Sequence, residues 1–205
     1  MKRKHLLLSI LLLCLLFSIT ACGKKSSDNA SSADNGNMLS GKHHIAIEVS
    51  NYGTIEVELD ADTAPITVTN FINLANSGFY NGLTFHRVID GFMIQGGDPN
   101  GDGTGGSSDT IKGEFSRNGV ENNISHVRGT ISMARSSANN SASSQFFIMQ
   151  KDTPSLDGQY AAFGTVTSGM DIVDKICKDC TDTNQNGVIT DKSKQPVIST
   201  VRVVD

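Results

Sequence analysis

The sequence predicts a mainly β protein whose strands form a closed antiparallel barrel with two helices. Several short segments alternate apolar and polar residues, which is typical of strands with one buried face. Glycine, asparagine and aspartate turns separate these segments, and only two segments space their apolar residues as a helix does. Many strands joined by short turns, with few helices, favour a barrel over a layered α/β fold.

The first 42 residues are expected to lie outside the folded domain. A positively charged start precedes an uncharged apolar run over 6–19, which is short for a membrane span of about 20 residues but typical of a secretion signal. Small residues before Cys22 make this segment resemble a bacterial lipobox, which implies cleavage before Cys22 and lipidation of its thiol; the alternative is an ordinary secretion signal. We therefore expect a signal peptide over 1–21, a flexible lipid-anchored tether over 22–42 and a folded domain over 43–205. Such a protein would be extracytoplasmic and anchored to a bacterial cell membrane.

The folded domain begins with a predicted β-hairpin followed by a helix. Residues 44–49 and 54–59 alternate apolar and polar side chains on either side of a glycine turn. Thr63 as N-cap and Pro65 in the first turn predict a helix start, and Gly78 predicts its end. Further strands are expected over 85–89, 92–95, 130–134, 145–150, 161–166 and 197–204.

The second predicted helix is short and ends near a pair of cysteines. Ser168 is expected to cap its N-terminus. Cys177 and Cys180 form a C-x-x-C pair at the other end, whereas redox C-x-x-C pairs lie at helix N-termini, where the dipole favours a thiolate. We therefore expect a structural disulfide or two free thiols. A zinc site would need two more ligands, and no second cysteine pair supplies them.

Two loops resemble ligand-binding motifs without completing them. Residues 182–187, DTNQNG, match the start of an EF-hand loop, but its twelfth position is Ser193 instead of the bidentate glutamate that calcium needs. The segment is interpreted as an insertion before the last strand, with Asn186–Gly187 as a hairpin turn. The glycine-rich residues 101–106 are followed by no Lys-Ser/Thr, so we interpret them as a backbone turn. No metal is expected.

Arg87 is a charged residue in a strand that is otherwise largely apolar. It lies among apolar residues in FHRVIDGFMIQGGD, residues 85–98. Burying a charge is costly unless it is paired, so Arg87 is either a structural ion pair or a group held out for a ligand. His86 alternates to the opposite face of the strand and is interpreted as structural.

Five motifs, in one order, make the folded part similar to the cyclophilins. They are FHRVIDGFMIQGGD, GDGTGG, RGTISMAR, SASSQFFIM and SLDGQYAAFG, and the match covers about residues 43–205. The resemblance implies an eight-stranded antiparallel barrel capped by two helices. It also implies peptidyl-prolyl cis-trans isomerase activity on proline-containing polypeptides. No cofactor is implied, because no covalent bond is made or broken in this reaction.

The resemblance implies a role for each matching residue. Arg87 would donate a hydrogen bond to the prolyl nitrogen of the twisted amide. Gln95 would contact the substrate backbone and steady the arginine, and Ala134 and Arg135 would bind the extended peptide through their main chain. The proline ring would be enclosed by Phe92, Met93, Phe147, Leu156 and Tyr160.

Three positions depart from the common family pattern. Ser155 stands where cyclosporin-sensitive members commonly carry tryptophan, and the chain has no tryptophan, so we expect weak cyclosporin binding. Tyr160 stands where many members have histidine, from which we expect an altered substrate preference without loss of activity. At Arg135 the family often has asparagine, a change that a main-chain role tolerates.

The composition and charge limit the other partners. A formal net charge of −4 argues against a general nucleic-acid binder, which usually carries basic patches. We expect a monomer that assists the folding of secreted or surface proteins. The alternatives are a non-catalytic chaperone that binds proline-containing segments, and an anchored adhesin that uses the same scaffold.

Overall fold

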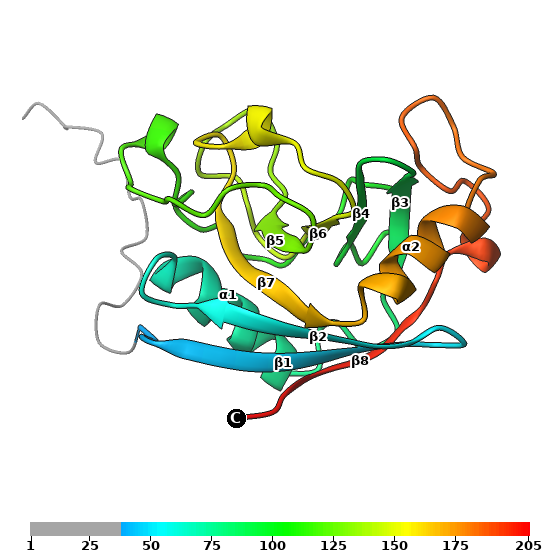
Figure 1. Ribbon diagram of the computed structural model, residues 1–205, viewed down its shortest axis with the longest axis horizontal. Coiled ribbons are helices and arrows are strands. Elements are labelled where there is room, and N and C mark those ends of the chain that lie inside the picture. Colours follow the sequence, from blue (N-terminus) through cyan, green and yellow to red (C-terminus); the bar gives the residue numbers. More distant parts are fainter. Residues whose placement is uncertain (1–37) are drawn as a thin grey trace, which may run out of the picture. The chain divides into compact units, whose positions relative to one another are not determined.

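Eight strands form one antiparallel sheet in the order β3-β4-β6-β5-β7-β2-β1-β8 in the computed structural model, which describes residues 38–205 (Figure 1). The predicted signal peptide, Cys22 and most of the predicted tether lie outside these residues. The strands are β1 (Lys42–Val49), β2 (Gly53–Asp60), β3 (Phe85–Ile89), β4 (Met93–Gly96), β5 (Thr130–Met133), β6 (Phe146–Met149), β7 (Ala162–Ser168) and β8 (Ile198–Val203). The helices are α1 (Pro65–Asn76) and α2 (Met170–Asp179), with short 3-10 turns η1 (Ser116–Asn118), η2 (Pro154–Leu156) and η3 (Lys192–Lys194).

The barrel is open, which corrects the expectation of a closed one. Within residues 38–205, the edge strands β3 and β8 are joined by one isolated bridge, between Thr84 and Val197, just outside each strand. Two features stop the ladder from extending. Pro196 has no amide hydrogen to donate, and the outer edge of β3 is paired instead with an earlier segment, through a bridge between Arg87 and Val188.

Helix α1 is capped by a residue far along the chain. The expectation that Thr63 caps it is wrong, because the Thr63 side chain makes no N-cap bond and donates to a carboxylate in the preceding turn. The buried carboxylate of Glu114 accepts hydrogen bonds from the amides of Ile66 (3.0 Å) and Thr67 (2.8 Å). A carboxylate at a helix N-terminus also complements the helix dipole.

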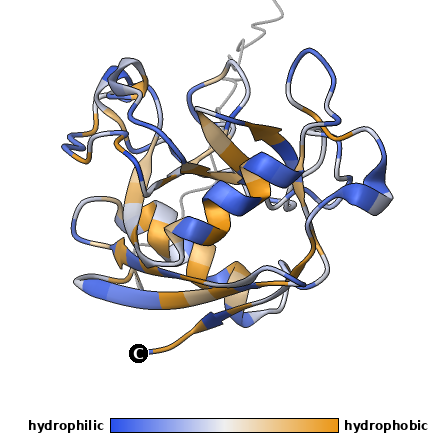
Figure 2. Ribbon diagram, turned by 45° about the vertical axis from the view of Figure 1, so that its right-hand side comes forward, coloured by the Kyte–Doolittle hydropathy of each residue, from blue (hydrophilic) through white to orange (hydrophobic). Residues whose placement is uncertain are grey.

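Helix α2 begins one residue later than expected. Ser168 ends β7, and Gly169, with a φ of 92°, is the N-cap, so the expectation that Ser168 caps the helix is wrong. Only glycine fits well here, since a Cβ would lie 2.6 Å from the carbonyl oxygen of Thr54. Figure 2 shows hydrophilic and hydrophobic stretches alternating along α2, and its buried residues are Val173, Ile176 and Cys177. Neither α1 nor α2, within the part of the chain described here, is long and apolar enough to cross a membrane.

The main core lies inside the curled sheet and is rich in aromatic rings. Phe71 of α1 packs at 4.8 Å on Tyr80 and at 5.3 Å on both Phe146 and Phe163, measured between ring centroids. All four rings are fully buried. This packing holds β6 against α1. It thereby also positions the side chains on the opposite face of β6.

Candidate active site

A row of side chains crosses four neighbouring strands on the outer face of the sheet. The strand register pairs Arg87 of β3 with Gln95 of β4, Gln95 with Phe147 of β6, and Phe147 with Ser132 of β5. A cavity of about 210 Å³ opens over this row. The residues that line it are the nine predicted from the sequence: Arg87, Phe92, Met93, Gln95, Ala134, Arg135, Phe147, Leu156 and Tyr160.

Arg87 is held by hydrogen bonds of its Nε and Nη1, including a long one from Nη1 to Sδ of Met93 at 3.9 Å, and its Nη2 has no partner within residues 38–205. Its Nε donates to the carbonyl oxygen of Asn186 at 2.7 Å, and its Nη1 donates to Oε1 of Gln95 at 3.0 Å. The register of β3 slips between Phe85 and Arg87, so that His86 is an extra residue of the bulge and is fully buried away from the cavity. Such a bulge re-aims the next side chain, here that of Arg87.

No carboxylate within residues 38–205 neutralises Arg87. Among the residues that the structure describes, none places a carboxylate oxygen within 4.0 Å of it. Burial lowers the pKa of the guanidinium, although arginine stays protonated in proteins. A half-buried cation whose partners are a carbonyl, a neutral amide and a thioether sulfur keeps its full charge available to a ligand in the cavity.

Gln95 is itself held by a second glutamine that the sequence did not single out. Its Nε2 donates to Oε1 of Gln145 at 2.8 Å. Gln145 in turn donates to the carbonyl oxygens of Gly105 at 2.7 Å and Gly103 at 3.2 Å. Arg87 is thus connected through two amides to the glycine-rich loop over 101–106, which limits the orientations open to its guanidinium.

The glycine-rich loop is a backbone turn around a buried aspartate. The carboxylate of Asp98 accepts from the amides of Asn100 (2.8 Å), Asp102 (3.1 Å) and Gly103 (2.6 Å). A Cβ on Gly105 would lie 2.1 Å from Asp98, so the turn needs glycine there. Its amides hold a carboxylate of the protein's own chain, which agrees with the interpretation as a backbone turn.

The apolar wall of the cavity is a cluster separate from the main core. Met93, Phe147 and Met149 are buried in it, and the half-buried residues packed against them include Phe92, Ala134, Leu156 and Tyr160. Phe147 meets Tyr160 edge to face at 5.7 Å between centroids. Ser155, which precedes Leu156, is exposed and does not line the cavity. The cavity therefore has aromatic and thioether walls and one cationic side.

A buried histidine supports Phe147 from behind. The ring of His126 is parallel to that of Phe147, with centroids 6.0 Å apart. Its nitrogens lie 2.9 Å from Asp157 Oδ1 and 3.0 Å from the Ser132 hydroxyl. Burial lowers the pKa of His126 even though Asp157 acts to raise it. This Ser-His-Asp arrangement cannot attack a substrate, since Ser132 is fully buried.

A second cavity, of about 340 Å³, adjoins the first and shares three of its residues, Gln95, Ala134 and Arg135. Its other walls are small or polar: Gly103, Thr104, Gly105, Gly106, Ser107, Ser136, Ser141, Ser143 and Gln145. Arg135 is the only charged residue among those that line it. We call it the side cavity.

The boundary between the two cavities offers an unpaired strand edge. β5 ends at Met133, and the amide of Ala134 bonds to the carbonyl oxygen of Gln145 at 2.9 Å. The amide and carbonyl of Arg135 make no backbone hydrogen bond within residues 38–205. An extended peptide could add its own main-chain bonds here.

The insertion before β8 supports Arg87, and the two cysteines at the C-terminal end of α2, which precedes it, are free thiols and not a disulfide. Its turn brings the carbonyl of Asn186 to Arg87, a contact through the backbone that no residue type in the sequence signals. Cys177 is a buried thiol, and burial raises its pKa to about 12; Cys180 is a half-buried thiol whose pKa burial also raises. Both shifts oppose thiolate chemistry.

Two side chains of the EF-hand-like segment, those of Asp182 and Asn184, have an oxygen engaged by the protein. Asp182 lies 2.7 Å from Nζ of Lys194. The Oδ1 of Asn184 accepts from the amides of Asn186 (2.9 Å) and Val188 (3.0 Å). Within residues 38–205 no group of three histidine, cysteine, aspartate or glutamate side chains could hold a metal ion.

Comparisons with protein families and with curated proteins both find peptidyl-prolyl cis-trans isomerases. The family model described as cyclophilin type peptidyl-prolyl cis-trans isomerase/CLD matches residues 44–203. Peptidyl-prolyl cis-trans isomerase A of Dickeya dadantii (strain 3937) is 48% identical over 141 residues, which cover 65% of this chain and 70% of that protein. Peptidyl-prolyl cis-trans isomerase B of Bacillus subtilis (strain 168) is 50% identical over 117 residues, 57% of this chain and 78% of that protein.

Solved structures agree with the sequences. A crystal structure of a cyclophilin type peptidyl-prolyl cis-trans isomerase of Cryptosporidium parvum has a TM-score of 0.70 at 30% identity, covering 80% of this chain and 99% of that one. A crystal structure of it in the presence of the dipeptide Ala-Pro has a TM-score of 0.69 at 31% identity, covering 79% and 99%.

Proposed function

The chain belongs to the cyclophilin-type peptidyl-prolyl cis-trans isomerases, and from this premise we propose that Arg87 carries its catalysis. The enzyme interconverts the cis and trans forms of X-Pro bonds and needs no cofactor. The observation that supports Arg87 is its guanidinium, which borders an apolar cavity without a carboxylate partner among the described residues.

The reaction needs stabilisation of a twisted amide. Rotation about the X-Pro bond breaks amide resonance and meets a barrier of about 18–20 kcal/mol. In the twisted state the prolyl nitrogen regains a lone pair that can accept a hydrogen bond, whereas both planar states lack it. Arg87 would donate to this nitrogen, and a donor that favours only the twisted state accelerates both directions.

One hydrogen bond does not supply the whole effect. A 10⁵-fold acceleration corresponds to about 7 kcal/mol, and a hydrogen bond to a charged group contributes about 1.5–3 kcal/mol. The remainder would come from a donor fixed in advance by Gln95 and Asn186, and from holding the chain on both sides of the bond.

The proline ring would occupy the 210 Å³ cavity, against Met93 and Phe147. The chain beside it would run along Ala134 and Arg135 and use the free amide and carbonyl of Arg135. A proline dipeptide accompanies the related Cryptosporidium parvum enzyme in its crystal structure, which supports a proline-peptide site in this fold.

Replacing Arg87 tests the proposal. We expect Arg87→Ala to lower kcat/KM for a short Ala-Pro-Phe peptide about 10²-fold, since it removes a charge-assisted bond made in the transition state. Arg87→Lys keeps the charge but loses the planar fork, so its rate should be intermediate. Arg202→Ala, on the surface of β8 and paired with Glu48, is the matched control and should keep the wild-type rate.

Unaltered turnover in folded Arg87→Ala would overturn the role of Arg87. The alternative function, a chaperone that only binds proline-containing segments, predicts something else. It would suppress aggregation of an unfolded client equally well with and without Arg87. Circular dichroism of each variant establishes that it is folded before rates are compared.

We further propose that the enzyme is a lipoprotein that speeds proline-limited folding of secreted or surface proteins. The support is the charged start, the apolar run over 6–19 and the position of Cys22. Proline isomerisation takes tens of seconds without a catalyst, so folding after export would benefit. Expression in a bacterium with radiolabelled palmitate should label the wild type in the membrane fraction and leave Cys22→Ala unlabelled; an unlabelled wild type would contradict the anchor.

A further inference from the structure

Arg135 is a second cation of the site that has no ionic partner in the described part of the chain. Its guanidinium lies between two aromatic rings, 5.0 Å from the centroid of Phe115 and 4.9 Å from that of Tyr160. Its hydrogen-bond acceptors are backbone carbonyl oxygens, those of Gln159 (2.8 and 3.0 Å), Ser136 (2.9 Å) and Ser137 (3.3 Å). Carbonyls satisfy N–H groups without cancelling the charge, and within residues 38–205 no carboxylate lies within 4.0 Å of it.

Carboxylates on neighbouring elements are committed elsewhere. Glu114, next to Phe115 in the chain, accepts three hydrogen bonds from Ile66 and Thr67 at the start of α1. Asp157, in the loop that leads to Tyr160, is bonded to His126. The positive charge of Arg135 is therefore uncompensated, although the protein as a whole has a formal charge of −4.

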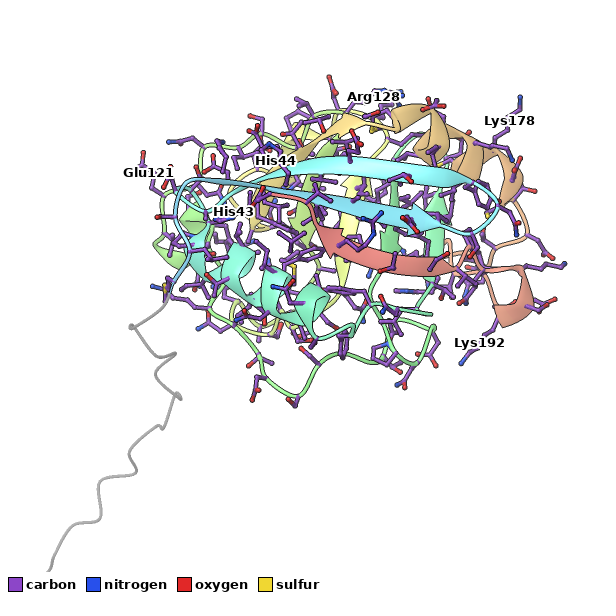
Figure 3. The ribbon with its side chains drawn as sticks, turned by 90° about the horizontal axis from the view of Figure 1, so that it is seen from below. His43, His44, Glu121, Arg128, Lys178 and Lys192 are labelled. Carbon is purple, nitrogen blue, oxygen red and sulfur yellow. The ribbon has the colours of Figure 1, made fainter. Side chains whose placement is uncertain are left out.

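The charge of Arg135 lies where it can act on a bound substrate. Arg135 lines both the proline cavity and the side cavity. No acidic residue is among the described residues that line the side cavity, and the hydroxyl of Ser143 is available there as a donor. The hydroxyls of Thr104 and Ser107 also line it, but they donate to Asp102 and to the carbonyl oxygen of Asp109. Other cations differ: Arg128 is paired with Asp174 at 2.7 Å, and Lys178 points outward from the surface (Figure 3).

We propose that Arg135 selects substrates that carry an acidic side chain close to the proline, seated in or at the mouth of the side cavity. This proposal rests on the isomerase site described above and adds a preference that the main-chain role of Arg135 does not give. A half-buried cation attracts a carboxylate more strongly than an exposed one does, because less water screens the pair. The neutral hydroxyl of Ser143 in the same cavity can complete the hydrogen bonding of the carboxylate.

Paired peptides that differ by one charge test the proposal. Two otherwise identical peptides carry glutamate or glutamine at the second residue before proline, and a second pair carries them at the second residue after it. For wild type we expect one of the two pairs to show a three- to tenfold higher kcat/KM for glutamate at low salt, falling toward equality at high salt. A Glu/Gln ratio cancels effects that act on both peptides alike.

Variants assign the preference to Arg135. Arg135→Gln should bring the ratio to about one, while Arg135→Lys should keep part of it because the charge remains. Arg117→Gln is the matched control: Arg117 bonds to the side chain of the same Gln159 but lines neither cavity, so its ratio should equal that of wild type. A wild-type ratio of one at both positions, or an unchanged ratio in Arg135→Gln, overturns the proposal.

Binding separates this proposal from the catalytic one. Calorimetric titration of the same peptides into Arg87→Ala gives a ratio of Kd values that does not depend on turnover. A glutamate preference in Kd with no effect of Arg87 on the rate would remove the catalytic role of Arg87 and keep the specificity role of Arg135. Equal Kd values for glutamate and glutamine peptides would remove the latter.

Discussion

Phe146 and Phe147 are neighbours on β6, and they face two different environments. Phe146 points into the curled sheet, where its ring centroid lies 5.3 Å from Phe71, 5.6 Å from Tyr80 and 6.0 Å from Phe85. Phe147 points outward, where its ring meets only His126 and Tyr160 among the aromatic pairs of residues 38–205, and borders the 210 Å³ cavity. One strand thus supplies a filled face, packed in the core around Phe146, and an unfilled face, where Phe147 borders a cavity.

The difference between the faces lies in what covers them. Helix α1 covers the inner face, and its one aromatic ring, that of Phe71, packs edge to face on Phe146 of β6. The outer face is bordered by the η2 turn with Leu156 and by the two arginines, which keep their charges unpaired. The same residue types therefore give stability on one face and a binding site on the other, depending on whether a regular element covers them.

The largest expected effect is the contrast between Phe146→Ala, which should mainly lower stability, and Phe147→Ala, which should mainly lower activity. Phe146→Ala should lower the free energy of unfolding by about 3–5 kcal/mol, because it leaves a closed cavity in the core. Phe147→Ala should lower it by only about 1–3 kcal/mol, since water already reaches that side chain's cavity. The order should reverse in kcat/KM, with Phe147→Ala losing about ten- to hundredfold. Urea unfolding and peptide kinetics measure the two quantities.

Equal effects of Phe146→Ala and Phe147→Ala would contradict this distinction between the two faces. Equal losses of stability would mean that the outer cluster is as much a part of the core as the inner one. Equal losses of kcat/KM, each corrected for the folded fraction, would mean that the pocket depends on the whole sheet more than on its own wall.

The cap of α1 is expected to show the second largest effect, and it acts on the filled face alone. Glu114→Ala removes three hydrogen bonds to a carboxylate and leaves the amides of Ile66 and Thr67 without an acceptor, which should cost about 2–3 kcal/mol. Glu114→Gln keeps one acceptor and should cost less. Thermal and urea unfolding measure the loss, and kcat/KM at 10 °C should stay at the wild-type value; a fall in kcat/KM of the folded variant would show that α1 is coupled to the pocket.

The sequence anticipates the local features of both faces and misses their long-range contacts. The strand expected over 85–89 coincides with β3, and Pro65 and Gly78 bounded α1, because the signals used act within a few residues. The cap from Glu114 and the link from Gln95 to Gln145 join residues about 50 positions apart, and no local signal reports such pairs. The open barrel was missed for the same reason, since it depends on where the Val188 segment pairs.

The smallest expected effect concerns two buried histidines, of which only one supports the wall of the cavity. Neither ring nitrogen of His86, which lies beside Gly103, has a hydrogen-bond partner within residues 38–205. His126 is buried behind Phe147 and bonded to Asp157 and Ser132. Burial is the largest influence on both and lowers the pKa of each. Each is about 6.5 in the unfolded chain. The unfolded chain therefore binds protons that the folded protein lacks, so the free energy of unfolding should fall as the pH drops below about 6.5, and stop falling below the folded pKa values.

The two histidines should differ in what their protonation does to catalysis. A proton on His126 would remove the acceptor for the Ser132 hydroxyl and disturb the ring behind Phe147, whereas His86 does not touch the cavity. Urea unfolding at pH 7.5 and 5.5 should show part of the loss removed in His126→Gln and another part in His86→Gln, with Asp157 ionised at both pH values. In wild type, kcat/KM should therefore fall at acid pH as His126 takes up its proton. This acid limb of the pH profile should disappear in His126→Gln and remain in His86→Gln. If His86→Gln abolished that limb as well, or if neither variant did, the limb would not arise from the contact of His126 with Phe147, and the wall of the cavity would not depend on His126.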